Sequence, residues 1–351
     1  MSKRFQQAFE AVPYQRSLVI VHGQFNSEGN LSHCLAPRGL YSSLVSSENV
    51  RRLARYIPRV CVLLRSRTSR VDSLSDAQLA WALSHVQPLS LRFEPFDTIG
   101  RAPLSDVFAQ TQKLVGTAIS PDRLEEVDCS IVRLRPVEPL HTIVSRAGRT
   151  LRTLHLPRSV MARFPPLPTL NPLVTLYGVV AGSGTTPETD IGLAVLRQAP
   201  QLQELEVQLT ISQEAGSGQY MELCGHVQDS LRKLAVSWSV PESQDGTLPA
   251  PAQDLSGFAA LRDLSLTGPP ESISLELLPP SLVRLSVCPI SGSSEEVARG
   301  VLERLRDPLW QRHLRALRLW FPESTGSPTD DQEEQLGRLC VRRGTMLYRM
   351  R

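Results

Sequence analysis

The chain has 351 residues, 41% of them hydrophobic, which is enough apolar material for two or three domains or one elongated array. Its formal net charge of +3 comes without long runs of Lys or Arg, so we expect no nucleic-acid partner. The longest apolar run, "SLVIV" at residues 17–21, is too short to cross a bilayer, and the initial "MSKRFQQAFE" lacks the apolar core of a signal peptide. We therefore expect a cytoplasmic or nuclear protein without membrane contact.

Residues 1–56 predict an N-terminal helical cap. A polar helix ends at Pro13, and "RSLVI" then predicts a strand. The segment "LYSSLVSSENVRRLARYI" at residues 40–57 predicts a second helix, which Pro58 ends before the strand Val60–Leu64. The pair His22-Gly23 resembles the oxyanion-hole segment of α/β-hydrolases. That chemistry requires a G-x-S-x-G nucleophile elbow, which the sequence lacks, so we interpret His22 as a strand-end or loop residue.

A hexad of the form Leu-x-x-Leu-x-Leu/Val recurs within residues 57–323. It reads "LRTLHL" from Leu151, "LQELEV" from Leu202, "LRKLAV" from Leu231, "LRDLSL" from Leu261, "LVRLSV" from Leu282 and "LRALRL" from Leu314. The last five starts are 29, 30, 21 and 32 residues apart, which suits one strand and one helix or loop per unit. Weaker copies are "VQPLSL" from Val86, "LEEVDC" from Leu124 and "LVTLYG" from Leu173.

The hexads predict an α/β fold, an irregular leucine-rich-repeat solenoid with parallel strands on the concave face and helices and loops on the convex face. The first leucine of each hexad should lie at the bend that enters the strand, and the other two should point inward. Unequal spacing and loops rich in Gly, Pro and Ser indicate an irregular, incomplete arc. The alternative is a compact α/β domain with several buried, leucine-rich strands.

Residues 324–351 predict a C-terminal capping helix and strand. The helix should cover Asp331–Arg342 and stop at Gly344, and "TMLYRM" should form the last strand. An apparent hexad, "LGRLCV" from Leu336, lies within this helix and is interpreted as a chance match. A charged terminal helix is what an open solenoid needs to close its core.

The order of "RSLVI", "LYSSLVSSENVRRLARYIPRVCVL", irregular hexads and "LCVRRGTMLYRM" resembles fungal F-box/leucine-rich-repeat proteins over nearly the whole chain. In that family an F-box, which docks the Skp adaptor of a cullin ubiquitin ligase, precedes such a segment, and the repeats select the substrate. The sequence has no Leu-Pro-x-Glu-Leu-like start, so residues 1–56 resemble only the segment after an F-box, and the F-box itself is missing or truncated. No F-box residue is carried over.

Other motifs give no reaction chemistry. "GSGTT" at residues 182–186 lacks the Lys and the third Gly of a phosphate-binding loop and predicts a flexible connection. Cys224 and His226 have no second ligand pair for zinc, and Ser230 and Lys233 match Ser-x-x-Lys only at the start of a repeat strand. The scattered cysteines, without a CxxC pair, predict free and mostly buried thiols in a reducing compartment: Cys34, Cys61, Cys129, Cys224, Cys288 and Cys340.

The concave surface is the remaining candidate for function. Its predicted binding residues are Glu126, Asp128, His155, Tyr177, Glu204, Glu206, Lys233, Asp263, Arg284, Arg318 and Trp320. Acidic side chains come first and basic ones later, a gradient that could orient a partner, and Tyr177 and Trp320 would be aromatic anchors. The alternative is an ordinary solvated sheet face.

We therefore expect a protein-protein interaction module and not an enzyme, with no cofactor and no metal. An unknown protein would bind the concave face. The resemblance implies a substrate-recognition receptor of a cullin ubiquitin ligase, with the Skp adaptor and cullin as partners if an F-box lies upstream. The alternative is a stand-alone leucine-rich-repeat scaffold or sensor unconnected to ubiquitin.

Overall fold

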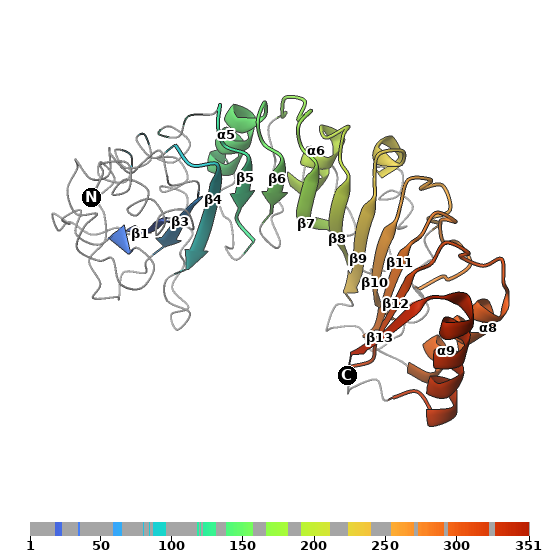
Figure 1. The fold of residues 1–351 in the computed structure, drawn as a ribbon. Coiled ribbons are helices and arrows are strands. Elements are labelled where there is room, and N and C mark those ends of the chain that lie inside the picture. The colour runs from blue at the N-terminus through green and yellow to red at the C-terminus, as the bar shows by residue number, and fades with distance from the viewer. Residues whose placement is uncertain are drawn as a thin grey trace, which may run out of the picture. The chain divides into compact units, whose positions relative to one another are not determined.

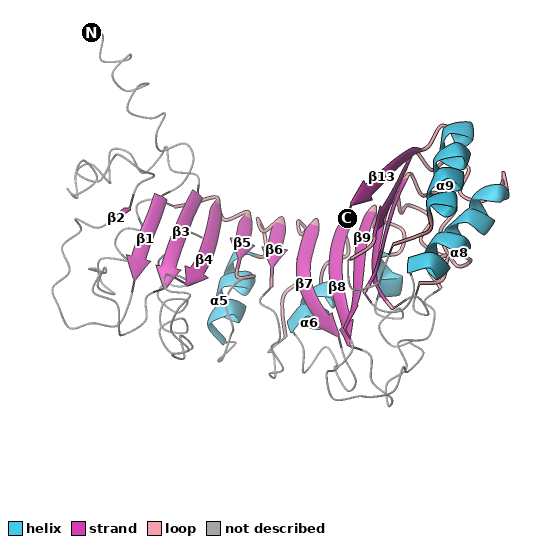
Figure 2. Cartoon of the chain, turned by 90° about the horizontal axis from the view of Figure 1, so that it is seen from below, coloured by secondary structure: helices cyan, strands magenta, loops and turns pink. Residues whose placement is uncertain are grey.

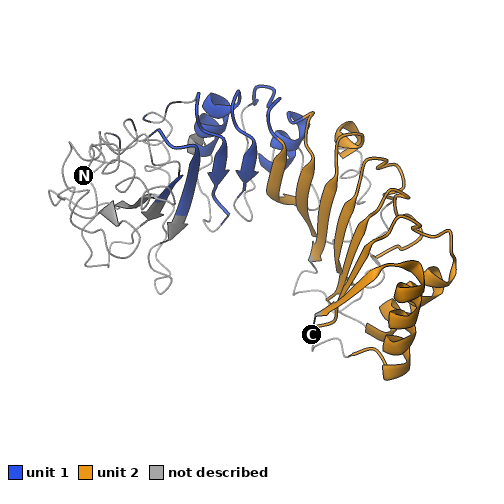
Figure 3. Cartoon of the chain, viewed as in Figure 1, with its two compact units in different colours: residues 1–173, 187–199 blue, residues 174–186, 200–351 orange. Residues whose placement is uncertain are grey.

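The computed structural model describes residues 18–22, 34–35, 59–64, 80, 84, 87–95, 118, 120, 122–130, 138–156, 166–181, 191–210, 224–239, 254–269, 273–290, 294–322 and 327–350. The chain divides into two compact units (Figure 3). Unit 1 comprises residues 1–173 and 187–199, and unit 2 comprises residues 174–186 and 200–351. The helices predicted before Pro13 and at residues 40–57, and the loop at 182–186, lie outside the described residues.

Unit 1 contains a mainly parallel sheet. Its strands are β1 (Leu18–His22), β2 (Cys34–Leu35), β3 (Arg59–Leu64), β4 (Ser90–Pro95), β5 (Glu126–Asp128) and β6 (Thr153–His155). β1, β3, β4, β5 and β6 pair in parallel in this order, and β2 is antiparallel to β1. The unit also holds helices α5 (Glu138–Ala147) and α6 (Ile191–Arg197). Because β1 pairs with β3, the sheet includes a strand from the segment that we assigned to the N-terminal cap.

Unit 2 contains strands that pair in parallel in the order of the sequence (Figure 1). They are β7 (Thr175–Ala181), β8 (Glu204–Thr210), β9 (Lys233–Ser239), β10 (Asp263–Gly268), β11 (Arg284–Pro289), β12 (Ala316–Trp320) and β13 (Met346–Met350). The connections contain the short helix η4 (Gly225–Val227) and helices α8 (Ser294–Arg306) and α9 (Asp330–Arg343). Figures 1 and 2 both place α8 and α9 on the same side of this sheet.

This sequential order establishes the fold class. A doubly wound α/β domain reverses its strand order at a switch point, whereas each strand of unit 2 pairs with the next strand of the chain. The chain therefore folds as an irregular leucine-rich-repeat solenoid, as the hexads predicted, and not as a compact α/β domain.

The core of unit 2 is a ladder of leucines in register. The pairing aligns Leu205, Leu234, Leu264, Leu285 and Leu317, and each is at most 3% exposed. The second inward position of the hexads forms a parallel row of Val207, Val236, Leu266, Val287 and Leu319. Burial of one such side chain stabilises the fold by about 1.5–3 kcal/mol. No single repeat could bury this apolar face alone, so the leucine ladder explains why successive repeats stack on one another.

The first leucine of each hexad lies at a bend, which explains the three-residue gap. Leu231 and Leu261 are fully buried immediately before β9 and β10. At the entry to β9, the backbone N–H groups of Arg232 and Lys233 both donate to the carbonyl oxygen of Gln203, at 2.8 and 2.9 Å. Two consecutive N–H groups can share one acceptor only where the chain turns, and the strand alternation begins after this turn.

A hydroxyl group joins each of several bends to the preceding repeat. Ser230 Oγ donates to the carbonyl oxygen of Leu202 at 2.8 Å, and Ser281 Oγ donates to that of Leu261 at 2.7 Å. In unit 1, Thr150 Oγ1 donates in the same way to Leu124, at 2.8 Å. The acceptor is in every case the first residue of the earlier hexad, whose side chain is buried. We call these contacts the hydroxyl staples.

Helix α9, near the C-terminal end of unit 2, has a defined cap at each end. Thr329 caps α9 through a capping box with Gln332, and Gly344 ends the helix with a φ of 64°. Leu336 and Cys340 are the buried residues of α9, and the other residues of this helix are partly or fully exposed. The apparent hexad from Leu336 is helical, as expected.

One weak copy of the repeat was assigned in the wrong phase. We placed it at Val86 with Leu89 and Leu91 pointing inward, but Leu89 is only partly buried. Leu91 pairs with Val127, the inward residue of β5, and Phe93 is also fully buried. The repeat therefore reads "PLSLRF" from Pro88. The ring of Pro88 occupies the buried bend position that a leucine occupies elsewhere.

Candidate functional site

The predicted binding residues lie on the side of the sheet that points away from the leucine ladder. We call this side the open face, and in unit 2 it includes Tyr177, Glu204, Glu206, Lys233, Asp263, Arg284, Arg318 and Trp320. All of them are partly or fully exposed, in alternation with buried strand residues. The inward and outward assignment made from the hexads is therefore confirmed for these strands. Whether they bind a partner remains a prediction.

In unit 1, the three predicted binding residues are Glu126, Asp128 and His155, and all are partly exposed. The carboxylate of Asp128 is already engaged: Arg92 Nε lies 3.4 Å from its Oδ2 atom. The backbone N–H and the hydroxyl of Ser130 donate to Oδ1 at 2.9 and 2.7 Å. These contacts fix the turn after β5, so the arrangement favours a structural role for Asp128.

A bulge in β7 places Tyr177 on the open face. Leu176 pairs with Leu205 and Val179 with Val207, so Tyr177 and Gly178 together oppose one residue of β8. Gly178 adopts a φ of 77°, a backbone conformation that side-chain-bearing residues rarely take. Bulges of this kind redirect a side chain, and this one turns the Tyr177 ring toward Glu204.

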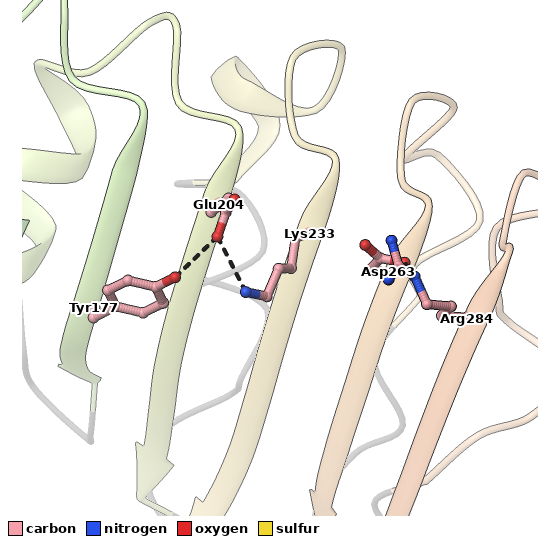
Figure 4. A network of polar contacts seen from close by, with 5 residues as sticks. All are labelled: Tyr177, Glu204, Lys233, Asp263 and Arg284. Carbon is pink, nitrogen blue, oxygen red and sulfur yellow. Dashed lines mark hydrogen bonds and ion pairs between the residues drawn. The ribbon is translucent and has the colours of Figure 1, made fainter. Parts of the chain in front are cut away.

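Tyr177, Glu204 and Lys233 form one polar cluster across three strands (Figure 4). The Tyr177 hydroxyl donates to Glu204 Oε2 at 2.9 Å, and Lys233 Nζ donates to the same oxygen at 3.1 Å. Lys233 Nζ also lies 5.8 Å from the centroid of the Tyr177 ring. Glu204 Oε2, on β8, therefore links side chains of both neighbouring strands, β7 and β9.

This cluster shifts three pKa values. Burial, together with the hydrogen bond to Glu204, raises the pKa of Tyr177. For Glu204, burial opposes ionisation, but the hydrogen bonds from Tyr177 and Lys233 outweigh it and lower the pKa. The hydrogen bond to Glu204 raises the pKa of Lys233. At neutral pH the cluster is thus a neutral phenol, a carboxylate and an ammonium group.

In one row of the open face the charges alternate from strand to strand. The pairing places Glu204 opposite Lys233, Lys233 opposite Asp263, and Asp263 opposite Arg284. Arg284 Nε contacts Asp263 Oδ1 at 2.5 Å, so this second pair is also neutralised (Figure 4). In this row the gradient expected from the sequence is therefore absent, because cross-strand neighbours of opposite charge pair with one another.

The next outward row has a different character. Glu206, Ala235, Ser265, Ser286, Arg318 and Tyr348 are in register from β8 to β13. Its middle residues are small, and a groove of about 370 Å³ lies above them. The groove is lined by charged residues (Lys233, Asp263, Arg284, Arg318), by small ones (Ala235, Ser265, Ser286, Ala316), and by Met346 and Tyr348, with Leu234, Leu264 and Leu285 between them.

Exposed side chains of β12 and β13 form a cluster at this end of the groove. The Arg318 guanidinium lies 5.4 Å from the centroid of the Tyr348 ring, and the Tyr348 hydroxyl contacts Met346 Sδ at 3.4 Å. Trp320, Met346 and Tyr348 are 45%, 58% and 41% exposed. We call Arg318, Trp320, Met346 and Tyr348 the β12–β13 cluster. Sequence reasoning missed Met346 and Tyr348, because "TMLYRM" was assigned only to a cap. Its alternation, in step with "ALRLW", was the available signal.

Among the described residues, neither the Ser–Lys pair nor the metal site suggested by short sequence motifs is formed. Ser230 donates to a backbone carbonyl and Lys233 to Glu204, so the two do not form a Ser–Lys pair. Cys224 is buried whereas His226 is exposed, and within the described part of the chain no three potential metal ligands gather. His22 ends β1, and its side chain lies outside the described atoms.

Five of the described cysteines form no disulfide bond: Cys61, Cys129, Cys224, Cys288 and Cys340. All except Cys61 are buried, and burial raises the pKa of both Cys288 and Cys340. The described helices include none that is both long and apolar enough to cross a membrane.

Comparison with known proteins identifies no family for this chain. No protein-family model matches it, and no curated protein matches it. A chain in the crystal structure of the Rad7 and Elc1 complex in yeast is 13% identical, over 87% of this chain and 78% of that chain, with a TM-score of 0.32. A likeness of this size carries no functional argument, so the fold assignment depends on the strand order and the leucine ladder described above.

Proposed function

We propose that this protein is a protein-binding module that uses the open face of unit 2. The observation that carries the proposal is the β12–β13 cluster, in which an arginine, a tryptophan, a tyrosine and a methionine are exposed on two adjacent strands. Arg, Trp and Tyr dominate binding hot spots, and Met is enriched at interfaces. Trp320 and Met346 lie on either side of the Arg318–Tyr348 pair, and their exposed apolar surface is typical of a site that a protein partner covers.

Mutation of the cluster tests this role against a matched surface. The double variant Trp320→Ala/Tyr348→Ala removes aromatic area from the open face. The control, Leu309→Ala/Val341→Ala, removes two apolar side chains that are 78% and 80% exposed elsewhere. Partners cross-linked to the full chain in its source cell would be identified by mass spectrometry with each variant.

We expect specific partners to disappear with the open-face variant, with a loss of about tenfold or more, and to persist with the control. If every partner persists with the open-face variant, the open face of unit 2 is not the binding surface and the proposal fails.

We propose further that this binding selects substrates for a cullin ubiquitin ligase, a role supported by the sequence resemblance to F-box/leucine-rich-repeat proteins. The competing candidate is a scaffold unconnected to ubiquitin. Co-purification from the source cell separates the two: a Skp adaptor and a cullin in stoichiometric amounts support the receptor. Partners captured through the open face without either protein support the scaffold.

A further inference from the structure

We infer that the groove of unit 2 binds an acidic peptide segment, with a carboxylate of the peptide at Arg318 and apolar side chains of the peptide on Trp320 and Met346. The inference depends on the proposed protein-binding function and specifies the chemistry of the partner.

Charge at the groove supports an anionic ligand. Three cations line it, Lys233, Arg284 and Arg318, against one carboxylate, Asp263. Two of these cations are neutralised, because Lys233 pairs with Glu204 and Arg284 pairs with Asp263. Glu204 and Asp263 thus compensate two of the three positive charges, and the remaining positive charge is that of Arg318. Among the residues that the structure describes, no carboxylate forms an ion pair with Arg318.

The geometry of Arg318 suits a carboxylate. Contact with the Tyr348 ring holds the guanidinium in place, so less side-chain entropy is lost when a ligand binds. A guanidinium that lies over an aromatic ring can keep N–H groups at its edge available, and these can donate two parallel hydrogen bonds to one carboxylate. A neutral ligand would leave this charge uncompensated as the groove loses water.

The surroundings of Arg318 suit a peptide in particular. Ala316 pairs with Met346 on one side of the Arg318–Tyr348 pair, and Trp320 pairs with Met350 on the other. The cation is therefore flanked by exposed apolar surface in both strand directions. The small side chains of Ser265 and Ser286 leave room for a backbone along the groove. Acidic and apolar side chains on one segment match this arrangement, whereas a bare polyanion uses only the cation.

Fluorescence polarisation with three short labelled peptides tests the inference on the full chain. The probes alternate leucine with glutamate, with glutamine or with lysine, and a labelled single-stranded DNA oligonucleotide serves as a polyanion without apolar side chains. The protein variants are Arg318→Gln, Arg318→Lys and the control Arg342→Gln, which removes an exposed charge from α9. Thermal unfolding of each variant verifies that the fold is retained.

We expect the glutamate–leucine peptide to bind about tenfold more tightly than the glutamine–leucine peptide. Arg318→Gln should abolish this difference, Arg318→Lys should retain part of it, and Arg342→Gln should leave it unchanged. Equal binding of the three peptides, no binding of any, or equally tight binding of the oligonucleotide would each overturn the inference. The protein-binding proposal is judged separately, by the loss of cross-linked partners in Trp320→Ala/Tyr348→Ala.

Discussion

At the scale of single residues, Glu204 shows how one side chain organises part of the open face. Its Oε2 atom accepts hydrogen bonds from Tyr177 and from Lys233, which come from the strands on either side. These bonds stabilise the ionised carboxylate and lower its pKa, although burial acts in the opposite direction. The contribution of Glu204 to stability is therefore greatest where the group is ionised in both the folded and the unfolded chain.

We predict that Glu204→Gln lowers the free energy of unfolding by about 0.5 kcal/mol at neutral pH, as expected for a half-exposed ion pair. Because the pKa of Glu204 is lowered in the folded state, this contribution is present above the unfolded pKa. It disappears as the pH falls through the folded pKa. Urea denaturation over a pH series measures the difference between wild type and variant. Glu206→Gln, on the same strand and exposed, is the control and should change the free energy of unfolding at neutral pH by less than about 0.5 kcal/mol.

At the scale of the secondary-structure elements, the hydroxyl staples connect one repeat to the next independently of the strands. Ser230 and Ser281 each satisfy a carbonyl oxygen of a fully buried leucine in the preceding bend. A buried carbonyl without a partner costs about 1–3 kcal/mol. Where Ser or Thr precedes a hexad, as at Ser230 and Ser281, the hydroxyl thus contributes to the stacking of repeats, although the leucine pattern does not include it.

We predict that Ser230→Ala lowers the free energy of unfolding by about 1–2 kcal/mol, because the carbonyl of Leu202 loses its hydrogen bond. The matched control is Ser265→Ala, which removes a hydroxyl from the partly exposed open face. Its effect should stay within about 0.5 kcal/mol. Urea midpoints of the two variants compare them directly. Equal midpoints would show that water satisfies the Leu202 carbonyl in the variant.

Sequence reasoning succeeded where local periodicity determines the structure. Leu264 and Leu266 had to point inward once the strand was recognised, and they are 3% and 2% exposed. It failed where the outcome depends on alignment between strands. The Asp263–Arg284 pair forms only because β10 and β11 meet in one register, which a stretch of either strand cannot indicate. The bulge at Gly178 and the phase of the repeat at Pro88 are likewise local exceptions that the hexad count does not contain.

At the scale of the whole molecule, each repeat should stabilise mainly the repeats directly before and after it. Each strand of unit 2 pairs with the strands before and after it in the chain, and the leucine ladder links the same neighbours. In such a linear array the free energy of folding is approximately a sum of repeat terms and neighbour terms. A defect in one repeat therefore weakens the adjacent repeats most.

We predict that Leu264→Ala, which removes a residue that is 3% exposed, costs about 2–5 kcal/mol. Hydrogen exchange followed by mass spectrometry should show the largest loss of protection in β9, β10 and β11, and a much smaller loss in β5 and β6. Leu154→Ala, in β6 of unit 1, is the matched variant and should give the reverse distribution. A uniform loss of protection in both variants would mean that the chain unfolds as a single cooperative block.

The alternating row of Glu204, Lys233, Asp263 and Arg284 has a consequence for how the chain avoids folding errors. The buried face of these strands offers a leucine at the same position in each, so the core alone hardly distinguishes the correct neighbour from the next repeat along. If a strand were skipped, Glu204 would stand beside Asp263, or Lys233 beside Arg284, and like charges in that position are destabilising. The alternating charges therefore disfavour the pairing of strands that are not neighbours in the chain.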